Sequence, residues 1–436
     1  MGLGAELPVW AILPFVGLLL SIALLPLGLP HFWEKNANKA LVAAAFSLPV
    51  VIELVGGFGH EGLHQLVEKG QEYLSFILLL LALFVITGGI VVRGSLSGTP
   101  LVNTAILGLG AVLANLIGTT GASVLLIRPL LRANAPRERK VHIVVFFIFV
   151  VSNCGGLLTP LGDPPLFLGF LKGVPFEWTL SLWKEWALVN GALLAIFNVW
   201  DQRVLDAEEL ARPGSQLEEV MRHEPLRIEG KRNFLFLLGV VAIIFASGRA
   251  EWPYGVQEAG MAALALVAFT VTPARLREDN RFSWGPIVEV AVLFAGIFVT
   301  MAPALLLLNA NAVSLGVREP WQFYWASGAL SSFLDNAPTY LTFAATAAGL
   351  QGIAVEGRYL AELLARGDVG AKLVAAVSCG SVMMGANSYI GNGPNFMVKA
   401  IAEEAGVRMP SFFGYMAYSM GILIPLFVVV TFVFMR

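Results

Sequence analysis

Charged residues are scarce in this sequence. Only 13% of its 436 residues are Asp, Glu, Lys or Arg, whereas 57% are hydrophobic and the mean hydropathy is +0.75. A water-soluble domain of this size would not have such a composition, so the expected solvent is a lipid bilayer. The formal net charge of −2 leaves no electrostatic basis for binding nucleic acid. We therefore expect an all-α polytopic membrane protein that has the lipid bilayer, and no nucleic acid, as a partner.

Cysteine is scarce as well. The two cysteines, Cys154 and Cys379, lie far apart, each inside an apolar segment. This arrangement favours neither a disulfide framework nor a metal-binding spacing. We expect two buried thiols and no resident cofactor.

Long apolar runs dominate the rest of the chain. A hydrocarbon core about 30 Å thick requires roughly 20 apolar residues in a helix. Runs of about this length are found at 9–29, 40–57, 73–92, 180–200, 233–249, 257–273, 284–308 and 411–434. Together with two interrupted spans, they predict about ten membrane spans.

A polar motif occurs twice within apolar sequence. Residues 152–167 read SNCGGLLTPLGDPPLF, and residues 381–396 read SVMMGANSYIGNGPNF, with matching Ser, Gly, Gly, Pro and Phe and with Asp163 opposite Asn392. Unwound backbone at membrane depth is tolerated only where it is buried in protein or lines a cavity. Two independent kinks are the simpler explanation, but the matches favour an internal duplication. The motif predicts broken helices over 141–172 and 371–402.

Two further apolar stretches carry polar clusters near their middle. Residues 101–132 contain NLIGTTGAS, and residues 320–350 contain SSFLDNAPT. A straight span would not require Gly, Pro and Asn at its centre. We therefore predict that each stretch is a re-entrant hairpin of two half-helices.

The distribution of Lys and Arg indicates the topology. With the N-terminus outside the cell, the loops that become cytoplasmic hold most of the basic residues, and 128–140 (RPLLRANAPRERK) is the strongest anchor. The two halves then run in opposite directions as an inverted repeat, over 1–200 and 233–436. The charged segment 201–232 between them is expected to be a cytoplasmic linker. The expected location is the inner or plasma membrane, with multiple spans.

Polar side chains recur at the predicted midplane. Ionisable groups in lipid are costly, so each is a candidate for function. The candidate ion- or substrate-binding residues are Asn115, Thr119, Thr120, Ser123, Ser152, Asn153, Thr159, Asp163, Asp335, Asn336, Thr339, Asn387, Ser388 and Asn392. Oxygen ligands suit hard cations, and half-helix N-termini favour anions, so the residue types alone allow either sign.

The motifs NLIGTTGASVLLIRP, SNCGGLLTPLGDPPL, LDNAPT and IGNGPNFMVKA, in this order and spacing, resemble the ion transporter superfamily. Within it they are most similar to the sodium/proton antiporters of the NhaD type and the related citrate-transporter-like (CitMHS) proteins. The resemblance covers most of the chain. It implies a homodimer in which a transport part, containing both hairpins, moves like an elevator against a scaffold part.

The two acidic residues at the midplane favour one transport mode. Dicarboxylate carriers of the superfamily have Ser-Asn-Thr motifs at the hairpin tips, whereas this chain has LDNAPT at 334–339 and GTTG at 118–121. Asp163 and Asp335 fit sodium/proton antiport better, because a carboxylate in a dry site can hold either a proton or Na⁺. The alternative function is Na⁺- or H⁺-coupled transport of a small anion, such as citrate, another dicarboxylate or arsenite. The alternative role for each Asp is a helix cap.

One motif suggests an enzyme. Residues 60–64 read HEGLH and match the H-E-x-x-H pattern of zinc hydrolases. An intramembrane zinc protease is thus a remote alternative, but the motif lies in a predicted glycine-rich external loop and lacks an evident third ligand. A channel is the third hypothesis, and the inverted repeat argues against it.

Overall fold

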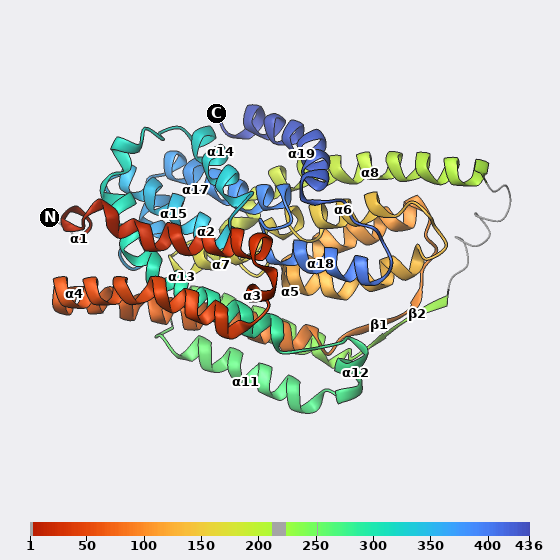
Figure 1. Ribbon diagram of the computed structural model, residues 1–436, viewed down its shortest axis with the longest axis horizontal. Helices are drawn as coiled ribbons and strands as arrows, with labels where there is room; N and C mark the ends of the chain where they lie inside the picture. Colours follow the sequence, from red (N-terminus) through yellow and green to blue (C-terminus); the bar gives the residue numbers. More distant parts are fainter. Residues whose placement is uncertain (1–2, 212–223, 251) are drawn as a thin grey trace.

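Helices make up nearly all of the structure, which is a computed structural model describing residues 3–211, 224–250 and 252–436 (Figure 1). The α-helices are α1 (Leu3–Glu6), α2 (Leu13–Gly28), α3 (Pro30–Trp33), α4 (Asn36–Thr87), α5 (Pro100–Ala133), α6 (Val141–Val150), α7 (Pro164–Leu171), α8 (Trp183–Ala211), α10 (Arg232–Ala250), α11 (Val256–Val271), α12 (Ala274–Asp279), α13 (Gly285–Ala310), α14 (Pro320–Ser331), α15 (Asn336–Leu350), α16 (Tyr359–Leu364), α17 (Asp368–Met383), α18 (Gly393–Glu404) and α19 (Phe412–Phe434). Short 3₁₀ helices are η1 (Val9–Ile12), η2 (Cys154–Leu157), η3 (Phe176–Leu182), η4 (Ala312–Leu315) and η5 (Met384–Asn387).

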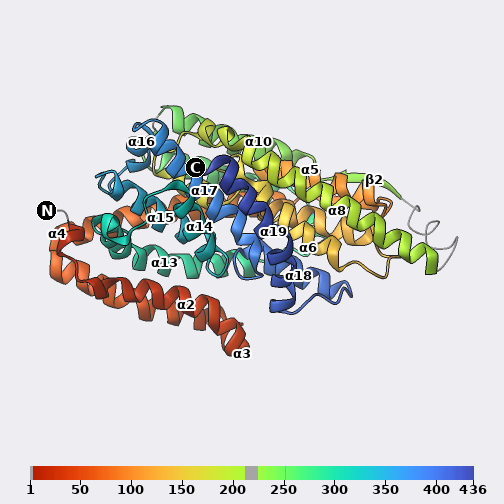
Figure 2. The ribbon, with the colours of Figure 1, turned by 90° about the horizontal axis from the view of Figure 1, so that it is seen from above.

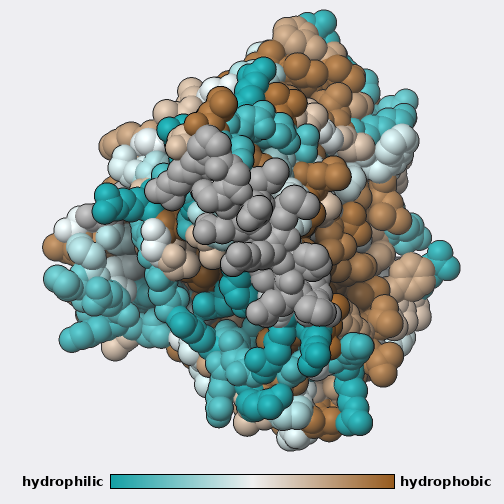
Figure 3. Space-filling model, turned by 90° about the vertical axis from the view of Figure 1, so that its right-hand side faces the viewer, coloured by the Kyte–Doolittle hydropathy of each residue, from teal (hydrophilic) through white to brown (hydrophobic). Residues whose placement is uncertain are grey.

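The predicted fold class is confirmed. Within the described residues, 8 helices are long and apolar enough to cross a membrane. Large apolar side chains are exposed along α2, α4, α10, α11 and α19, where lipid rather than water would cover them. Figure 3 shows one end of the molecule, where hydrophilic residues gather beside a band of hydrophobic residues on one flank. The chain is therefore an all-α polytopic membrane protein.

The helices form two groups around a central cavity. Long helices α4 and α13 pack against each other, with α2 and α11 beside them. The broken helices and hairpins make the other group, in which α14 packs on α17, α15 on α7, and α18 on α5. Figure 2 shows α2 and α3 along one edge of the molecule, with α6 and α15 further inside. Helix α6 has buried residues on every side, as expected for a helix that is apolar all round.

Helix α4 reverses direction within its span of 52 residues. Gly59 has φ of 56° and ψ of −122°, a conformation that glycine adopts readily. The turn brings Gly62 so close to Leu54 that an added Cβ would lie 1.9 Å from the Leu54 carbonyl oxygen. The sequence-based expectation of a loop at 60–64 was wrong, because His60 to His64 continue the second arm of α4 as helix.

A small antiparallel sheet, which the sequence did not indicate, joins the first half of the chain to the end of the segment 201–232. Strand β1 (Val91–Ser95) pairs with β2 (Glu224–Glu229), with Val91 opposite Glu229. Arg93 forms an ion pair with Glu229 (Nε to Oε1, 2.7 Å), and this hydrogen bond holds the pKa of Glu229 below its usual range. The pair therefore stays charged at neutral pH.

The expected linker 201–232 divides into parts. Its first residues continue α8 to Ala211, and Asp201 is completely buried. Residues 212–223 lie outside the described residues, and the segment ends with β2 and the start of α10.

Candidate functional site

The first hairpin bends deep in the protein. Gly118, with φ of 77° and ψ of 154°, interrupts α5, and the two arms of the helix run back together. Where the arms end, Asn103 and Asn134 donate to each other's side-chain oxygens at 3.0 and 2.7 Å. The residues around Gly118 therefore form a tip held at a defined depth by the pairing at its base.

The second hairpin is interrupted between Ser331 and Asn336. Asp335 caps α15, because its Oδ1 accepts a hydrogen bond from the Ala337 amide at 3.0 Å, and Thr339 donates to the Asp335 carbonyl at 3.0 Å. The capping role that the sequence left open for Asp335 is thus present in the geometry. Its role in ion binding remains a prediction.

Each hairpin tip docks onto a broken helix in the same way. The hydroxyl of Thr159 donates to the Asn115 carbonyl oxygen, and the hydroxyl of Ser388 donates to the Ser332 carbonyl oxygen. In both places the amide of the residue two positions later donates back to that hydroxyl, at 3.2 and 3.3 Å. Thr159 and Ser388 occupy the same position in the two copies of the motif, so the repeated sequence makes repeated contacts.

Asp163 lies where these four elements meet, and only 1% of it is exposed. Its Oδ1 accepts hydrogen bonds from Thr119 Oγ1 (2.8 Å) and Asn392 Nδ2 (3.3 Å), and its Oδ2 accepts one from Asn336 Nδ2. Asp163 occupies the N-cap position of α7, yet its side chain makes no capping bond. The carboxylate instead joins the two hairpin tips to the second broken helix.

In the part of the chain that the structure describes, Asp163 has no basic partner. Its hydrogen-bond donors are a hydroxyl and two amides, and no ion pair to Asp163 is found among the described residues. The side-chain oxygen of Asn336 is buried beside it and has no hydrogen-bond partner in the described structure. A buried carboxylate is costly unless its charge is compensated, so the site is suited to receive a proton or a small cation. Asp163 and Asn336 are the residues that offer oxygen ligands for it.

A second group of amides lies next to this carboxylate. Asn153 donates to Asn395 Oδ1 at 2.7 Å and accepts from Asn392 at 3.2 Å. Asn395, which is fully buried, donates in turn to the carbonyl oxygens of Gly385 and Ser388, both at 2.9 Å. The candidate binding residues predicted from the sequence did not include Asn395. Its place in the repeated motif, within the run NGPNF, could have identified it.

The remaining predicted residues support the tips. Asn115 bridges to the first broken helix, donating to the Gly155 carbonyl and accepting from the Leu158 amide, both at 2.7 Å. Ser123 and Ser152 share a hydrogen bond of 2.8 Å. Asn387 donates to Ser332 Oγ at 2.9 Å. These contacts are structural, and they place the four residues around the Asp163 carboxylate without direct contact to it.

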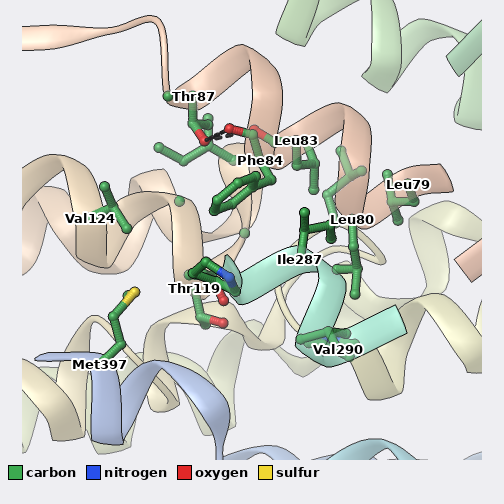
Figure 4. A pocket seen from close by; sticks show the side chains of 18 of the residues that line it. Leu79, Leu80, Leu83, Phe84, Thr87, Thr119, Val124, Ile287, Val290 and Met397 are labelled. Carbon is green, nitrogen blue, oxygen red and sulfur yellow. Dashed lines mark hydrogen bonds between the residues drawn. The ribbon is translucent and has the colours of Figure 1, made fainter. Parts of the chain in front are cut away.

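A cavity of about 250 Å³, here called the Asp163 cavity, opens beside the first tip. Its polar lining includes Asp163, Thr119 and Thr120, and its wall is largely apolar. Figure 4 shows Leu83 and Phe84 of α4 across the cavity from Thr119. The cavity therefore lies between the helix group that carries the site and the α4 and α13 group.

Two arginines line the Asp163 cavity away from the tip. Arg128 is on the second arm of α5, and Arg281 follows α12. Glu404 pairs with Arg281 and lies 3.9 Å from Arg128 Nη1, whereas Arg128 Nε is buried and has no hydrogen-bond partner in the described structure. The cavity thus contains an acidic group at one place and basic groups at another.

The features that suggested other chemistry do not form a metal centre. In the described ranges, no group of three or more His, Cys, Asp or Glu side chains could hold a metal ion. His60 and His64 stay exposed on α4. Cys154 and Cys379 are free and buried, as expected.

Comparison with known proteins identifies the family. No curated protein matches the sequence. The family model CitMHS_2, whose description is "Putative citrate transport", matches residues 4–435. Because this match spans nearly the whole chain, the protein belongs to the CitMHS_2 family and is a multi-pass membrane transporter rather than an enzyme.

Proposed function

We propose that this protein is a secondary active transporter that exchanges Na⁺ for H⁺ at Asp163. The observation that carries the proposal is the buried Asp163 carboxylate, which has three neutral hydrogen-bond donors and no basic partner in the described structure. A carboxylate in this setting is stabilised by binding either a proton or a cation. Because the same oxygens would hold both, binding of one displaces the other.

Oxygen ligands for sodium are available around the carboxylate. Hard cations prefer carboxylate, amide and carbonyl oxygens. The unpartnered Asn336 side-chain oxygen supplies an amide ligand next to Asp163. Asp335 belongs to the same hairpin tip, and we keep it as a second acidic candidate, although its side chain caps α15.

The arrangement of the helices supports alternating access. The tips and broken helices contact one another around Asp163, and the Asp163 cavity lies between part of this group and the wall made by α4 and α13, while α15 packs on α13 and α7 contacts α4 elsewhere. We propose that the hairpins and broken helices move as a unit against α4 and α13, in the manner of an elevator. We also propose that the two hairpins are re-entrant and that the two halves of the chain form an inverted repeat. We further propose that the protein is a homodimer in the inner or plasma membrane, with its N-terminus outside.

Cation-coupled transport of a small anion is the second candidate. It is favoured by the family description and by Arg128 and Arg281 in the wall of the same cavity. In this case Na⁺ or H⁺ at Asp163 would drive the uptake of an anion such as citrate. The two candidates share the carboxylate and differ in whether an anion is required.

Flux measurements in proteoliposomes distinguish the candidates. A pH-sensitive dye inside the vesicles would report proton movement after addition of Na⁺, Li⁺ or K⁺, with and without citrate, and Asp163→Asn would serve as the control. Proton flux driven by Na⁺ alone supports antiport. Flux that requires citrate supports the second candidate, and the absence of both fluxes contradicts the proposal.

A further inference from the structure

A cluster of four charged residues, three of them buried and Glu68 partly exposed, lies at the opposite end of α7 from Asp163. Lys172 directly follows α7, and its Nζ lies 2.5 Å from Glu72 Oε1 and 3.0 Å from Glu68 Oε1. Lys69 pairs with Glu72 at 2.9 Å. We call Glu68, Lys69, Glu72 and Lys172 the gate cluster. Its formal charges sum to zero, two positive and two negative.

The gate cluster links the two helix groups. Glu68, Lys69 and Glu72 belong to the second arm of α4, whereas Lys172 belongs to the segment that carries Asp163. Helix α7 is only 8 residues long, so a displacement of the Asp163 carboxylate relative to α4 would also displace Lys172. The ion pairs therefore hold α7 in one position against α4.

A second cavity, here called the Lys172 cavity, has a volume of about 400 Å³ and lies at this end. Helix α7 borders both cavities, since Phe167 lines the Asp163 cavity whereas Phe170 and Leu171 line the Lys172 cavity. Lys172 and Glu72 are only 2% and 9% exposed. Lys172 and Glu72 thus line the Lys172 cavity as nearly buried charges at one end of α7, while the Asp163 carboxylate lines the other cavity at the other end.

Buried ion pairs have the energetics that a reversible barrier requires. Their Coulombic attraction is largely offset by the cost of removing the charges from water, so a fully hydrated open state is close in free energy to the paired closed state. Removing one partner is different, because it leaves an uncompensated buried charge and favours the hydrated state. A change of a single charge in the cluster should therefore shift the balance between closed and open.

We propose that the gate cluster is the closed gate of the transport cycle on the side of the Lys172 cavity. In this proposal, the ion pair between Lys172 and Glu72 holds α7 against α4 in the closed state. When α7 moves along α4, the pairs separate, water enters from the Lys172 cavity, and access from the Asp163 cavity closes. This inference rests on the proposed alternating access, and it assigns a role to residues that do not touch the Asp163 carboxylate.

Reciprocal cysteine labelling tests the gate in detergent, where both faces are accessible and no transported solute is needed. In a background of C154A and C379A, a reporter Val174→Cys lines the Lys172 cavity and a reporter Val124→Cys lines the Asp163 cavity. In the parent, the buried Val174 position should react slowly with a water-soluble maleimide.

Neutralising the gate should change the two rates in opposite directions. With Lys172→Met, labelling at position 174 should rise at least about fivefold and labelling at 124 should fall by a similar factor. Lys172→Arg, which keeps the charge, should restore the parent rates. Lys184→Met, on an exposed residue of α8, is the matched control and should change neither rate.

The labelling rates test the gate proposal independently of the proposed transport function. If Lys172→Met does not fold, Glu72→Gln, which removes the carboxylate that Lys172 and Lys69 share, is judged by the same criterion. If the labelling rate rises at position 174 but does not fall at position 124, the variant has only loosened the structure locally and the gate proposal is wrong. Two unchanged labelling rates also contradict the proposal. If vesicles show no ion-driven flux while the reciprocal change occurs, the proposed function fails and the gate stands.

Discussion

Asn392 Nδ2 donates a hydrogen bond to Asp163 Oδ1 at 3.3 Å, so two residues at the same position of a repeated motif, 229 residues apart, contact each other directly. The repeat has therefore brought its two copies face to face at the centre of the protein. Because one copy supplies an acid and the other an amide, this contact contains one titratable group rather than two. A pair of carboxylates at this distance would have to share a proton.

Asp163→Asn should abolish Na⁺-driven proton flux, because the amide keeps the volume and one acceptor oxygen but cannot take up a proton. Asp335→Asn should keep flux within about threefold of wild type if Asp335 acts only as a cap, because Asn caps helices about as well as Asp, and should abolish flux if Asp335 is the second acidic ligand. Dye-based flux in proteoliposomes measures both variants. The assignment of Asp163 is wrong if its Asn variant still exchanges Na⁺ for H⁺ at the wild-type rate.

Acidification should weaken apparent Na⁺ affinity. A proton and Na⁺ compete for the Asp163 oxygens, so the Na⁺ concentration for half-maximal flux should rise by up to about tenfold per pH unit once the carboxylate is mostly protonated. Flux measured against Na⁺ concentration at several pH values tests this expectation. A half-maximal concentration that is constant across the pH range contradicts competition at one site.

Gly118→Ala should destabilise the first hairpin. At φ of 77° and ψ of 154°, an alanine is strained by about 1–3 kcal/mol even though its Cβ would have ordinary contacts. Thermal unfolding in detergent measures the loss. Gly421→Ala in α19 is the control, because no atom lies within 4 Å of the added Cβ and helix propensity favours Ala by about 0.5–1 kcal/mol. Equal effects at both positions would contradict the special role of Gly118.

Asn395→Leu should disrupt the amide group next to Asp163. Leucine is the residue at the matching position of the first motif, but here it removes the Asn395 hydrogen bonds to the Gly385 and Ser388 carbonyl oxygens. It also removes one of the two acceptors of the Asn153 amide, which still donates to Ile148. Each unsatisfied buried group costs about 1–3 kcal/mol. The thermal unfolding midpoint should fall and flux should decrease. Asn311→Leu, on an exposed residue whose side-chain amide donates only to the Leu307 carbonyl at 2.9 Å, should lower stability by no more than about 0.5–1.5 kcal/mol.

Single cysteines test the orientation of the repeats. Ala135 is exposed at the base of the first hairpin, and Gly357 is exposed between α15 and α16. In intact cells, an impermeant maleimide should label Gly357→Cys and should reach Ala135→Cys only after lysis. Labelling of both from the same side would contradict the inverted repeat.

Sequence patterns located the breaks well because their causes are local. Clusters of glycine, proline and polar residues favour an interruption, so the motif with Asp163 and the cluster with Gly118 both marked true interruptions, whereas single prolines such as Pro303 and Pro425 lie inside continuous helices. In lipid, the polar side chains of these interruptions are stable only where they contact one another or other polar groups. Their convergence around Asp163 therefore follows the prediction closely.

Features that depend on distant partners were not predictable. The reversal of α4 at Gly59 was expected as a loop, because a run of polar residues resembles solvated sequence whether or not it is helical. Strand β1 pairs with a segment more than a hundred residues later, and nothing in its own sequence indicates that partner. Lys172 and Glu72 were overlooked for the same reason, since each is an ordinary charged residue until the fold buries them together.

The shortness of the broken helices constrains the order of assembly. Helices α6 and α7 have 10 and 8 residues, so at 1.5 Å per residue they reach only about 15 and 12 Å, about half the hydrocarbon thickness or less. The unwound segment between them contains Asn153, whose amide partner Asn395 is made 242 residues later. A ribosome that has completed the first half has thus released helices that cannot settle in the bilayer alone. The first half cannot adopt its final packing until the second half has been synthesised and docks against it.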